Sequence, residues 1–347
     1  MALRFIQAGL GGWGYSWARD VLMKNEQVEL VACVDISEEI LQRVRTELGI
    51  QQTFTSLEEA LDTVETDAVL ITSPLPAHAP LALTALRAGK HVLLEKPFAA
   101  TIEEARHLVE VAEQQNVILA ISQNYRFYPA VQAVRKLIQN NTLGPVASVN
   151  LDFRRYDNTA PVETYRHYHI WQPLLVDMSI HHFDLMRYVL GQEPTQISCT
   201  TWSPSWSRYK EDPAGAATIS FTGGAVVSYR GNWVSTGPET PWAGEWHMEC
   251  EQGEIVWTSR GAGPEDERVT VRPRGKRPYG LRLPEVPKQD RHGSLTSFIQ
   301  AVQTGEEPSI SGRNNLPTLA LMFASVEAAT SGKPVTFEQQ STTISQQ

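Results

Sequence analysis

The chain has 347 residues, enough for two domains with full hydrophobic cores. Its formal net charge of -9 argues against nucleic acid or an anionic membrane surface as the main partner. The three cysteines are widely separated and match no zinc or disulfide spacing, so we expect them to be small core residues in a reducing compartment. Because a strand already begins at Leu3 and no apolar run is long enough to span a membrane, the sequence predicts a cytoplasmic protein.

The first strand, Leu3–Ala8, leads directly into a glycine-rich turn, Gly9–Gly14, with the spacing G-x-G-x-x-G. In a dinucleotide-binding fold the first glycine permits the tight turn, the second lets the backbone approach a pyrophosphate, and the third allows close packing of helix on strand. The helix that follows would offer its amino-terminal amides to the phosphates. Alone this pattern is a weak signal, since a glycine-rich turn is often only a turn.

A second strand ends at Asp35, which lies 21 residues after Gly14. A carboxylate at this place can accept hydrogen bonds from the ribose hydroxyls of adenosine and repel a 2′-phosphate. No arginine follows it to hold that phosphate. The sequence therefore favours NAD over NADP. The alternative is that Asp35 only caps the helix that we expect over Ser37–Leu48.

Strands and helices continue to alternate up to about residue 123. We expect further helices from Ser56, over Ala77–Ala88 and from Thr101 to Gln115, and strands over Asp67–Thr72, His91–Glu95 and Val117–Ser122. This rhythm is typical of a doubly wound parallel sheet. Residues 1–123 are therefore predicted to form an NAD-binding Rossmann domain.

The strand His91–Glu95 runs into Lys96 and Pro97. A lysine at the carboxyl end of a buried parallel strand lies where open α/β sheets bind their ligands. Pro97 restricts Lys96 to an extended backbone, which fixes the direction in which the ammonium group leaves the sheet. The alternative is an ordinary surface lysine before a loop.

Residues 124–347 are predicted to form an α+β domain for substrate binding and oligomerisation. Its most informative part is a helix over Asp177–Tyr188, capped by Gly191. Asp177 and His181 are four residues apart, so we expect their side chains to meet, with the carboxylate raising the basicity of the imidazole as suits a general base. One alternative is a core histidine bonded for structure alone. Another is a metal site, but no metal-ligand spacing supports one, and we expect none; its candidates would be His167, His169, His181 and His182.

From Thr195 to about Val271 the pattern predicts a large, mostly antiparallel open sheet. We expect a surface loop over residues 260–290, then helices over Ser294–Thr304 and Asn315–Ser331, a short strand and a polar tail. An open sheet covered on one face also predicts a homodimer or homotetramer through the other face, since an apolar face needs cover. The tryptophans in and before the sheet could bind carbohydrate, but core packing or a subunit interface is the simpler interpretation for most of them: Trp171, Trp202, Trp206, Trp233, Trp242, Trp246 and Trp257.

Over nearly its whole length the chain resembles the glucose–fructose oxidoreductase/inositol dehydrogenase (Gfo/Idh/MocA) family of NAD(P)-dependent sugar dehydrogenases. The Glu-Lys-Pro motif together with the Asp/His helix is far more specific than the glycine turn alone. The chain departs from the family at Gln172-Pro173, where a Gly-Gly pair is common, and at Ser179, where glycine is usual. The likeness rests on Gly9–Gly14, Ser73-Pro74 with His78, Ala88–Pro97, Asn124-Tyr125-Arg126, the set Asp177/His181/Asp184 and Gly332–Val335.

The resemblance implies that Lys96 touches the reacting hydroxyl and that His181 is the acid/base, oriented by Asp177. Removal of the hydroxyl proton would then release hydride to C4 of the nicotinamide. Pro97 is often cis in such proteins. The implied cofactor contacts are Gly9, Gly11, Gly12, Trp13, Gly14, Asp35, Ser73, Pro74, His78, Glu95, Lys96 and Asn124. The implied substrate contacts are Lys96, Tyr125, Arg126, Arg154, His169, Trp171, Asp177 and His181.

The expected activity is NAD-dependent hydride transfer between nicotinamide and a secondary hydroxyl of a sugar, inositol or related polyol. One alternative is a glycoside-cleaving enzyme that holds NAD tightly for transient oxidation and would retain it on purification. The other is a non-enzymatic, NAD-responsive regulator. Such regulators can lose the catalytic residues, whereas Lys96, Asp177 and His181 are all present here.

Overall fold

The computed structural model describes residues 2–337, which fold into two compact units. The first unit contains the chain up to Phe127 together with Pro287–Leu319, and the second contains Tyr128–Val286 and the chain from Ala320 onward. The sequence predicted a division at residue 123, with everything after it in one domain. The structure differs because residues 287–319 return to pack on the first core. The predicted polar tail falls mainly in residues 338–347, outside the described part of the chain.

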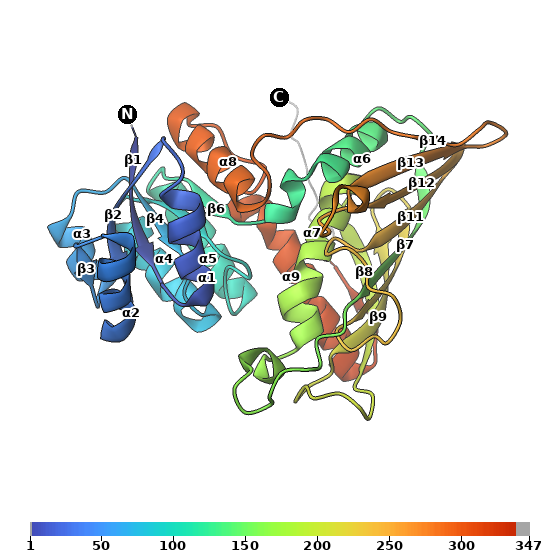
Figure 1. Ribbon diagram of the computed structural model, residues 1–347. Helices are drawn as coiled ribbons and strands as arrows, with labels where there is room; N and C mark the ends of the chain where they lie inside the picture. The colour runs from blue at the N-terminus through green and yellow to red at the C-terminus, as the bar shows by residue number, and fades with distance from the viewer. Residues whose placement is uncertain (1, 338–347) are drawn as a thin grey trace. The chain divides into compact units, whose positions relative to one another are not determined.

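The first unit is built on six parallel strands in the order β3-β2-β1-β4-β5-β6 (Figure 1). This order confirms the doubly wound sheet predicted from the sequence. The strands are β1 (Leu3–Ala8), β2 (Val28–Val34), β3 (Thr53–Phe54), β4 (Ala68–Ile71), β5 (His91–Leu94) and β6 (Leu119–Ile121). The helices between them are α1 (Gly12–Trp17), α2 (Glu38–Arg43), α3 (Leu57–Thr63), α4 (His78–Arg87) and α5 (Ile102–Gln114), with α1 and α2 continuing in π-helical turns over Ala18–Leu22 and Val44–Leu48.

Local sequence explains where several of these elements begin. The side chains of Ser37, Ser56 and Thr101 each accept a hydrogen bond from the backbone amide three residues further on, which caps α2, α3 and α5. The strands depend on burial instead, since every residue of β4 is apolar and buried. Central strands of this kind fix the carboxyl edge of the sheet, where the predicted cofactor residues lie.

Helix α8 (Asp290–Thr304) and the first part of α9 (Gly312–Ser331) complete the first unit. Leu295, Phe298 and Ile299 of α8 are buried in the same core as Phe5 of β1. The rings of Phe5 and Phe298 meet edge to face, with their centroids 5.8 Å apart. Burial of these large apolar side chains explains why the segment belongs to the first unit although it follows most of the second in the sequence.

The second unit contains a nine-stranded sheet in the order β14-β13-β12-β11-β7-β10-β9-β8-β15. All neighbouring strands are antiparallel except β7 and β10, which are parallel. Helices α6 (Pro129–Gln139) and α7 (Ser179–Leu190) lie on one face of this sheet (Figure 1). The strands are β7 (Val146–Arg154), β8 (Pro194–Trp202), β9 (Ala214–Phe221), β10 (Val226–Asn232), β11 (Glu245–Cys250), β12 (Gly253–Thr258), β13 (Arg268–Pro273), β14 (Tyr279–Gly280) and β15 (Val335–Thr336).

The predicted open sheet is confirmed, but two expectations about this unit are wrong. The predicted loop over residues 260–290 contains β13 and β14. The sheet face opposite the helices is not apolar either. Burial alternates along the strands, so that Leu151 and Tyr229 are buried while Asn150 and Ser228 are exposed. The uncovered face therefore carries mainly hydroxyl, amide and charged side chains. The expected apolar face, which was the reason to predict an oligomer, is not present on these strands.

The tryptophans divide between core and surface. Trp233, Trp246 and Trp257 are buried, and the rings of the last two stack with their centroids 4.5 Å apart. Trp202 and Trp206 are exposed, so the core interpretation holds for only part of the set. No helix in residues 2–337 has both the length and the apolar character required to cross a membrane.

We predict that Phe298→Ala lowers the free energy of unfolding by about 3–5 kcal/mol, because it leaves a cavity against Phe5. Denaturant unfolding with purified protein measures this. Gln300→Ala, at an exposed position of the same helix, is the matched control and should change the free energy of unfolding by less than about 0.5 kcal/mol. A small loss for Phe298→Ala would mean that α8 is not part of the first core.

Candidate functional site

The glycine turn is packed so tightly against the end of β4 that two of its residues must be glycine. Gly9 has a φ of 91°, and a Cβ there would overlap the backbone nitrogen of Ser73. A Cβ at Gly14 would overlap the carbonyl oxygen of Gly9. Thr72 Oγ1 donates a hydrogen bond to that carbonyl at 2.6 Å. The turn is therefore fixed by contacts within the protein.

The other two glycines of the turn have no such reason to be glycine. A Cβ at Gly11 or Gly12 would meet no protein atom within 4 Å. Both residues are exposed and stand at the amino end of the helix that begins with α1. Open space beside amides at a helix start is what the close approach of a pyrophosphate requires. The turn thus fits a dinucleotide, which makes Gly11 and Gly12 the residues that would hold its phosphates.

Asp35 lies beside this turn and does not cap a helix. Its carboxylate accepts hydrogen bonds from the backbone amides of Leu10 at 2.7 Å and Ser37 at 3.0 Å. The capping role that was the alternative interpretation belongs to Ser37 itself. The half-buried carboxylate is next to Ile36, whose side chain is 93% exposed. Asp35 is thus anchored to the glycine turn, where it could bind ribose hydroxyls through the lone pairs that remain.

His78 connects the two loops that follow β4 and β5. Its ring nitrogens lie 2.7 Å from the Ser73 carbonyl oxygen and 2.8 Å from the Pro97 carbonyl oxygen. Burial lowers the pKa of His78, although both contacts with carbonyl oxygens oppose that shift. The neutral ring can donate to only one of the two carbonyls at a time. His78 is buried and acts through these loops, while Pro74 beside it is exposed.

Lys96 and Glu95 lie where the sequence predicted, directly after β5. Glu95 is buried, and its carboxylate accepts hydrogen bonds from Trp17 Nε1 at 2.8 Å and from the Lys96 amide at 3.3 Å. The Lys96–Pro97 peptide bond is cis. Lys96 itself is half-buried. Trp17 therefore holds Glu95, which in turn contacts the backbone that carries the predicted catalytic lysine.

Arg291 of α8 contacts the glycine-turn helix and was not among the predicted residues. Its guanidinium group lies 4.3 Å from the centre of the exposed Trp13 ring and donates a hydrogen bond to Ser16 Oγ at 3.1 Å. Its Nη1 atom is buried and makes no hydrogen bond with the described residues. Only the fold brings position 291 to this helix, so no local pattern could have identified it. It would add a cation beside the phosphate-binding turn.

The predicted residues Asn124, Tyr125 and Arg126 are all buried. Asn124 Nδ2 donates a hydrogen bond to Asp290. Arg126 donates to the Ser309 carbonyl at 2.6 Å and to Asn314 Oδ1 at 3.2 Å. These contacts attach residues 287–319 to the first unit. The described contacts of Asn124 and Arg126 are structural, and their predicted roles toward cofactor and substrate remain predictions.

In the second unit Asp177 belongs to an ionic cluster that the sequence did not predict. Asp177 lies in a π-helical turn, Pro173–Met178, that precedes α7. Its carboxylate is 3.3 Å from His167 Nε2. The other ring nitrogen of His167 is 2.6 Å from Asp157 Oδ2, to which the Tyr209 hydroxyl also donates at 2.6 Å. His167 therefore bridges two carboxylates.

Electrostatics favour a charged His167. Burial works against the imidazolium form, but hydrogen bonds with Asp157 and Asp177 outweigh it and raise the pKa of His167 to about 9. Burial likewise opposes ionisation of Asp157, yet its bonds with His167 and Tyr209 hold the pKa of that carboxyl below its usual range. Burial and the nearby Asp157 raise the pKa of Tyr165 to about 12. At neutral pH the cluster thus contains an imidazolium and an ionised Asp157.

His181 and His182 occupy the start of α7 and have different surroundings. Both are buried. His182 contacts the Tyr229 hydroxyl at 3.1 Å and the Trp242 carbonyl at 3.0 Å, and burial lowers the pKa of its ring to about 4. A neutral ring that donates to the carbonyl and accepts from the hydroxyl satisfies both contacts. His182 therefore faces the sheet as a structural residue, whereas a direct contact of His181 with Asp177 stays a prediction.

The remaining predicted substrate residues are placed unevenly. Arg154 forms an ion pair with Glu245 at 2.6 Å and donates to the Pro238 carbonyl, so its charge is already compensated. His169 is exposed and contacts the Val162 carbonyl at 2.9 Å. Trp171 exposes 49% of its surface. Trp171 thus offers an accessible aromatic face, while Arg154 is held by neighbours on the sheet.

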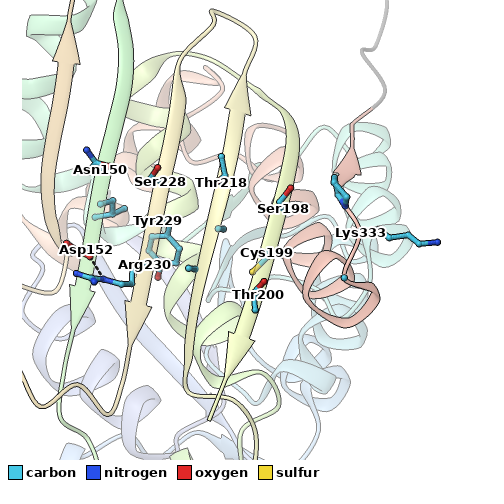
Figure 2. Close-up of a pocket in the computed structure, with 15 residues that line it drawn as sticks. Asn150, Asp152, Ser198, Cys199, Thr200, Thr218, Ser228, Tyr229, Arg230 and Lys333 are labelled. Carbon is cyan, nitrogen blue, oxygen red and sulfur yellow. Dashed lines mark hydrogen bonds and ion pairs between the residues drawn. The ribbon is translucent and has the colours of Figure 1, made fainter. Parts of the chain in front are cut away.

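A hollow in the second unit lies over the nine-stranded sheet, apart from the Asp177 cluster. It lies over β7, β10, β9 and β8, on the face opposite α7 (Figure 2). Its volume is about 710 Å³. Arg230 and Asp152 form an ion pair at 2.6 Å within it. Its exposed lining includes Asn150, Thr218 and Ser228. Side chains on this face cannot reach the Asp177 cluster, because successive strand residues point to opposite faces.

No group of three or more His, Cys, Asp or Glu side chains suited to a metal ion occurs within residues 2–337. Of the four histidines considered for such a site, His167 bridges carboxylates and His182 faces the sheet. The three cysteines are free, with Cys33 and Cys199 buried as expected of core residues and Cys250 half-buried.

Comparison with known proteins agrees with this description. The chain is 26% identical to 1,5-anhydro-D-fructose reductase of Ensifer adhaerens, over 89% of this chain and 91% of that protein. It is 25% identical to myo-inositol 2-dehydrogenase of Thermotoga maritima, over 97% of this chain and 99% of that protein. The crystal structure of an oxidoreductase from Agrobacterium radiobacter, in complex with NAD+, L-tartaric acid and magnesium, has the same fold, with a TM-score of 0.82 at 20% identity over 97% of this chain and 98% of that one.

Two family descriptions match separate parts of the sequence. The oxidoreductase family with an NAD-binding Rossmann fold matches residues 3–123, and the GFO/IDH/MocA C-terminal domain matches residues 131–256. Together they cover most of the chain and agree with the glycine turn and the second sheet found in the structure. The resemblance seen in the sequence is thereby confirmed: the chain is an NAD-binding oxidoreductase of the Gfo/Idh/MocA family.

Proposed function

We propose that this oxidoreductase transfers hydride between NAD and a secondary hydroxyl of a sugar, inositol or related polyol. The observation that carries the proposal is the carboxyl edge of the first sheet. There the glycine turn has open space at Gly11 and Gly12 and packs against Ser73. His78 contacts the carbonyls of Ser73 and Pro97, which connects the turn to the loop that carries Lys96. The substrate class is supported by relatives named as an anhydrofructose reductase and a myo-inositol dehydrogenase.

In the proposed reaction bound NAD supplies the hydride acceptor, and the protein supplies binding and proton transfer. The Lys96 ammonium donates a hydrogen bond to the substrate oxygen and stabilises the negative charge that develops there. His181 accepts the hydroxyl proton at a ring nitrogen, which makes the carbon a hydride donor. Asp177 orients His181 and stabilises the imidazolium that forms. In the reductive direction His181 returns the proton.

We propose NAD rather than NADP as the cofactor. Asp35 is anchored by the Leu10 and Ser37 amides, so it cannot easily turn away from a ribose bound beside the turn. A 2′-phosphate would face its charge. Within the described residues no arginine or lysine stands next to Asp35 in the sequence to offset it, since the next residue is Ile36.

We predict that Lys96→Ala lowers kcat by roughly 1,000-fold and leaves the Kd for NAD within about twofold, because the ammonium acts on the reacting oxygen. NADH absorbance with inositols, aldoses, anhydrosugars and glycosides measures turnover, and quenching of tryptophan fluorescence measures binding. Lys90→Ala, at the other end of β5, is the matched control and should keep full activity.

Two results would contradict this assignment. Loss of NAD binding by folded Lys96→Ala protein would make Lys96 a cofactor residue instead of a catalytic one. Cleavage of glycosides without added NAD, by protein that purifies with the cofactor bound, would replace the dehydrogenase by an enzyme that recycles its cofactor.

We predict that Asp35→Asn raises the Kd for NAD about tenfold and weakens the preference over NADP, because it keeps the acceptor for the Leu10 amide but removes the charge. Fluorescence titration with both cofactors tests this. Asp62→Asn, an exposed carboxylate on α3, gives the same change of net charge and should change neither Kd. An unchanged preference in Asp35→Asn would remove Asp35 from the ribose site.

We also propose that the chain forms a homodimer or homotetramer through the uncovered face of the nine-stranded sheet. The hollow over β7, β10, β9 and β8 and its exposed hydroxyl and charged groups support this, because they can pair with a second copy (Figure 2). We predict that Ser228→Arg lowers the mass measured by light scattering to that of a monomer, while Gln300→Arg does not. A wild-type monomer would contradict the proposal.

A further inference from the structure

In the ionic cluster around His167, Asp177 is the one member with a role in the proposed reaction. The members of the cluster come from four separate segments. Asp157 follows β7, Tyr165 precedes the turn Arg166–His169, and His167 lies in that turn. Asp177 precedes α7, and Tyr209 lies between β8 and β9. Such convergence of titratable groups beside a residue assigned to catalysis is typical of functional sites.

We propose that His167 is a positioning residue of the acid/base pair: as an imidazolium it bridges Asp157 and Asp177 and thereby fixes the direction and charge of the Asp177 carboxylate. This inference rests on the proposed function, since Asp177 matters only if it supports His181. Asp177 exposes 35% of its side chain, so it needs a partner to hold one rotamer. His167 exposes only 15% of its side chain and is itself well fixed.

Aromatic packing fixes the imidazole ring. Trp233 and Tyr209 meet it edge to face, with centroids 4.7 and 5.4 Å away. Trp233 Nε1 donates to the Pro173 carbonyl, at the start of the turn that carries Asp177. The ring therefore cannot rotate without disturbing both neighbours, and its Nε2 stays directed at Asp177.

Asp157 gives the bridge its charge. Its Oδ2 atom accepts from His167 at 2.6 Å, from Tyr209 at 2.6 Å and from Tyr165 at 3.2 Å. A carboxylate held by such donors stays ionised and favours a proton on both nitrogens of His167. The raised pKa of His167, about 9, agrees with this.

The other charged groups on these elements have partners elsewhere or are exposed. Arg208 donates to the Ala160 carbonyl, Glu211 accepts from the Gln172 amide, and His169 contacts the Val162 carbonyl. Arg166 and Lys210 are exposed. The charge of His167 is thus governed by Asp157, Asp177 and the two tyrosines.

The position of the Tyr209 hydroxyl suggests how the bridge changes when His167 loses its proton. Tyr209 Oη lies 2.8 Å from His167 Nδ1 as well as 2.6 Å from Asp157. Above pH 9 the hydroxyl can donate to the bare Nδ1, while Nε2–H still donates to Asp177. Asp177 would keep its hydrogen bond but lose the positive charge beside it. We therefore expect kcat to fall as the pH rises through about 9, because the active form is the one with protonated His167.

Two substitutions separate the bridge from simple packing. The amide nitrogen of a glutamine can take the place of Nε2, and that of an asparagine the place of Nδ1. His167→Gln therefore keeps a donor for Asp177, and His167→Asn keeps only one for Asp157. We predict that kcat falls about 10-fold in His167→Gln and about 100-fold in His167→Asn, with KM within about twofold, and that neither variant shows the change near pH 9. Equal activity of the two, or an unchanged pH profile, would overturn the inference.

A measurement without substrate tests the bridge itself. NMR of protein labelled at histidine Cε1 should show one resonance that titrates near pH 9, is missing in His167→Gln and moves toward pH 6.5 in Asp177→Asn. His107→Gln, an exposed histidine of α5, should remove a different resonance and leave activity unchanged. Titration of His167 at or below pH 6.5, or no response to Asp177→Asn, would overturn the inference. Absence of turnover in the wild type would instead overturn the proposed function, while the NMR result would still decide whether the bridge exists.

Discussion

The backbone contact between Gly9 and Ser73 is the constraint on which the glycine turn and the Lys96 loop of the first unit depend. Because no side chain fits between the turn after β1 and the loop after β4, the two are held at a fixed separation. His78 extends this constraint, since its ring touches the Ser73 and Pro97 carbonyls. The loop with Lys96 is therefore positioned relative to the glycine turn through a short series of buried contacts. A dinucleotide in the turn and a substrate at Lys96 would share one rigid edge.

The His167 cluster of the second unit is fixed by charge instead of close backbone packing. Asp157, His167 and Asp177 each come from a different segment, and no local pattern aligns them. The backbone also contributes at Gln172, which has a φ of 47° and donates its amide to Glu211 at 2.7 Å. A hydrogen bond to the backbone supports a conformation that most side chains disfavour.

The sequence was informative wherever function depends on local order. The glycine turn, Asp35, the strand before Lys96 and the helices predicted to begin near Ser37, Ser56 and Thr101 lie where they were predicted, because each is determined by neighbours within a few residues. It could not show that α8 returns to Phe5, that Arg291 reaches Trp13, or that His167 joins Asp177, since those contacts link distant segments through the tertiary fold. The spacing of Asp177 and His181 predicts a contact between those two residues and carries no signal for the contact of Asp177 with His167. The two tyrosines and Asp157 carried no signal in the sequence that separates them from surface residues.

Charge in the cluster has a consequence for the chemistry proposed for His181. A base that must both take and return a proton needs a pKa near the working pH, and a neighbouring carboxylate raises that pKa. Two ionised carboxylates without a cation between them would raise it further and would make the proton hard to release. His167 places a positive charge between Asp157 and Asp177. This charge partly offsets the negative charge of Asp177, so Asp177 raises the basicity of His181 less than it would alone. Tyr165 and Tyr209 donate hydrogen bonds to Asp157. These bonds stabilise the Asp157 carboxylate, so it does not take the proton from the His167 imidazolium. A reversible dehydrogenase would benefit from this balance, because the same histidine has to serve oxidation and reduction.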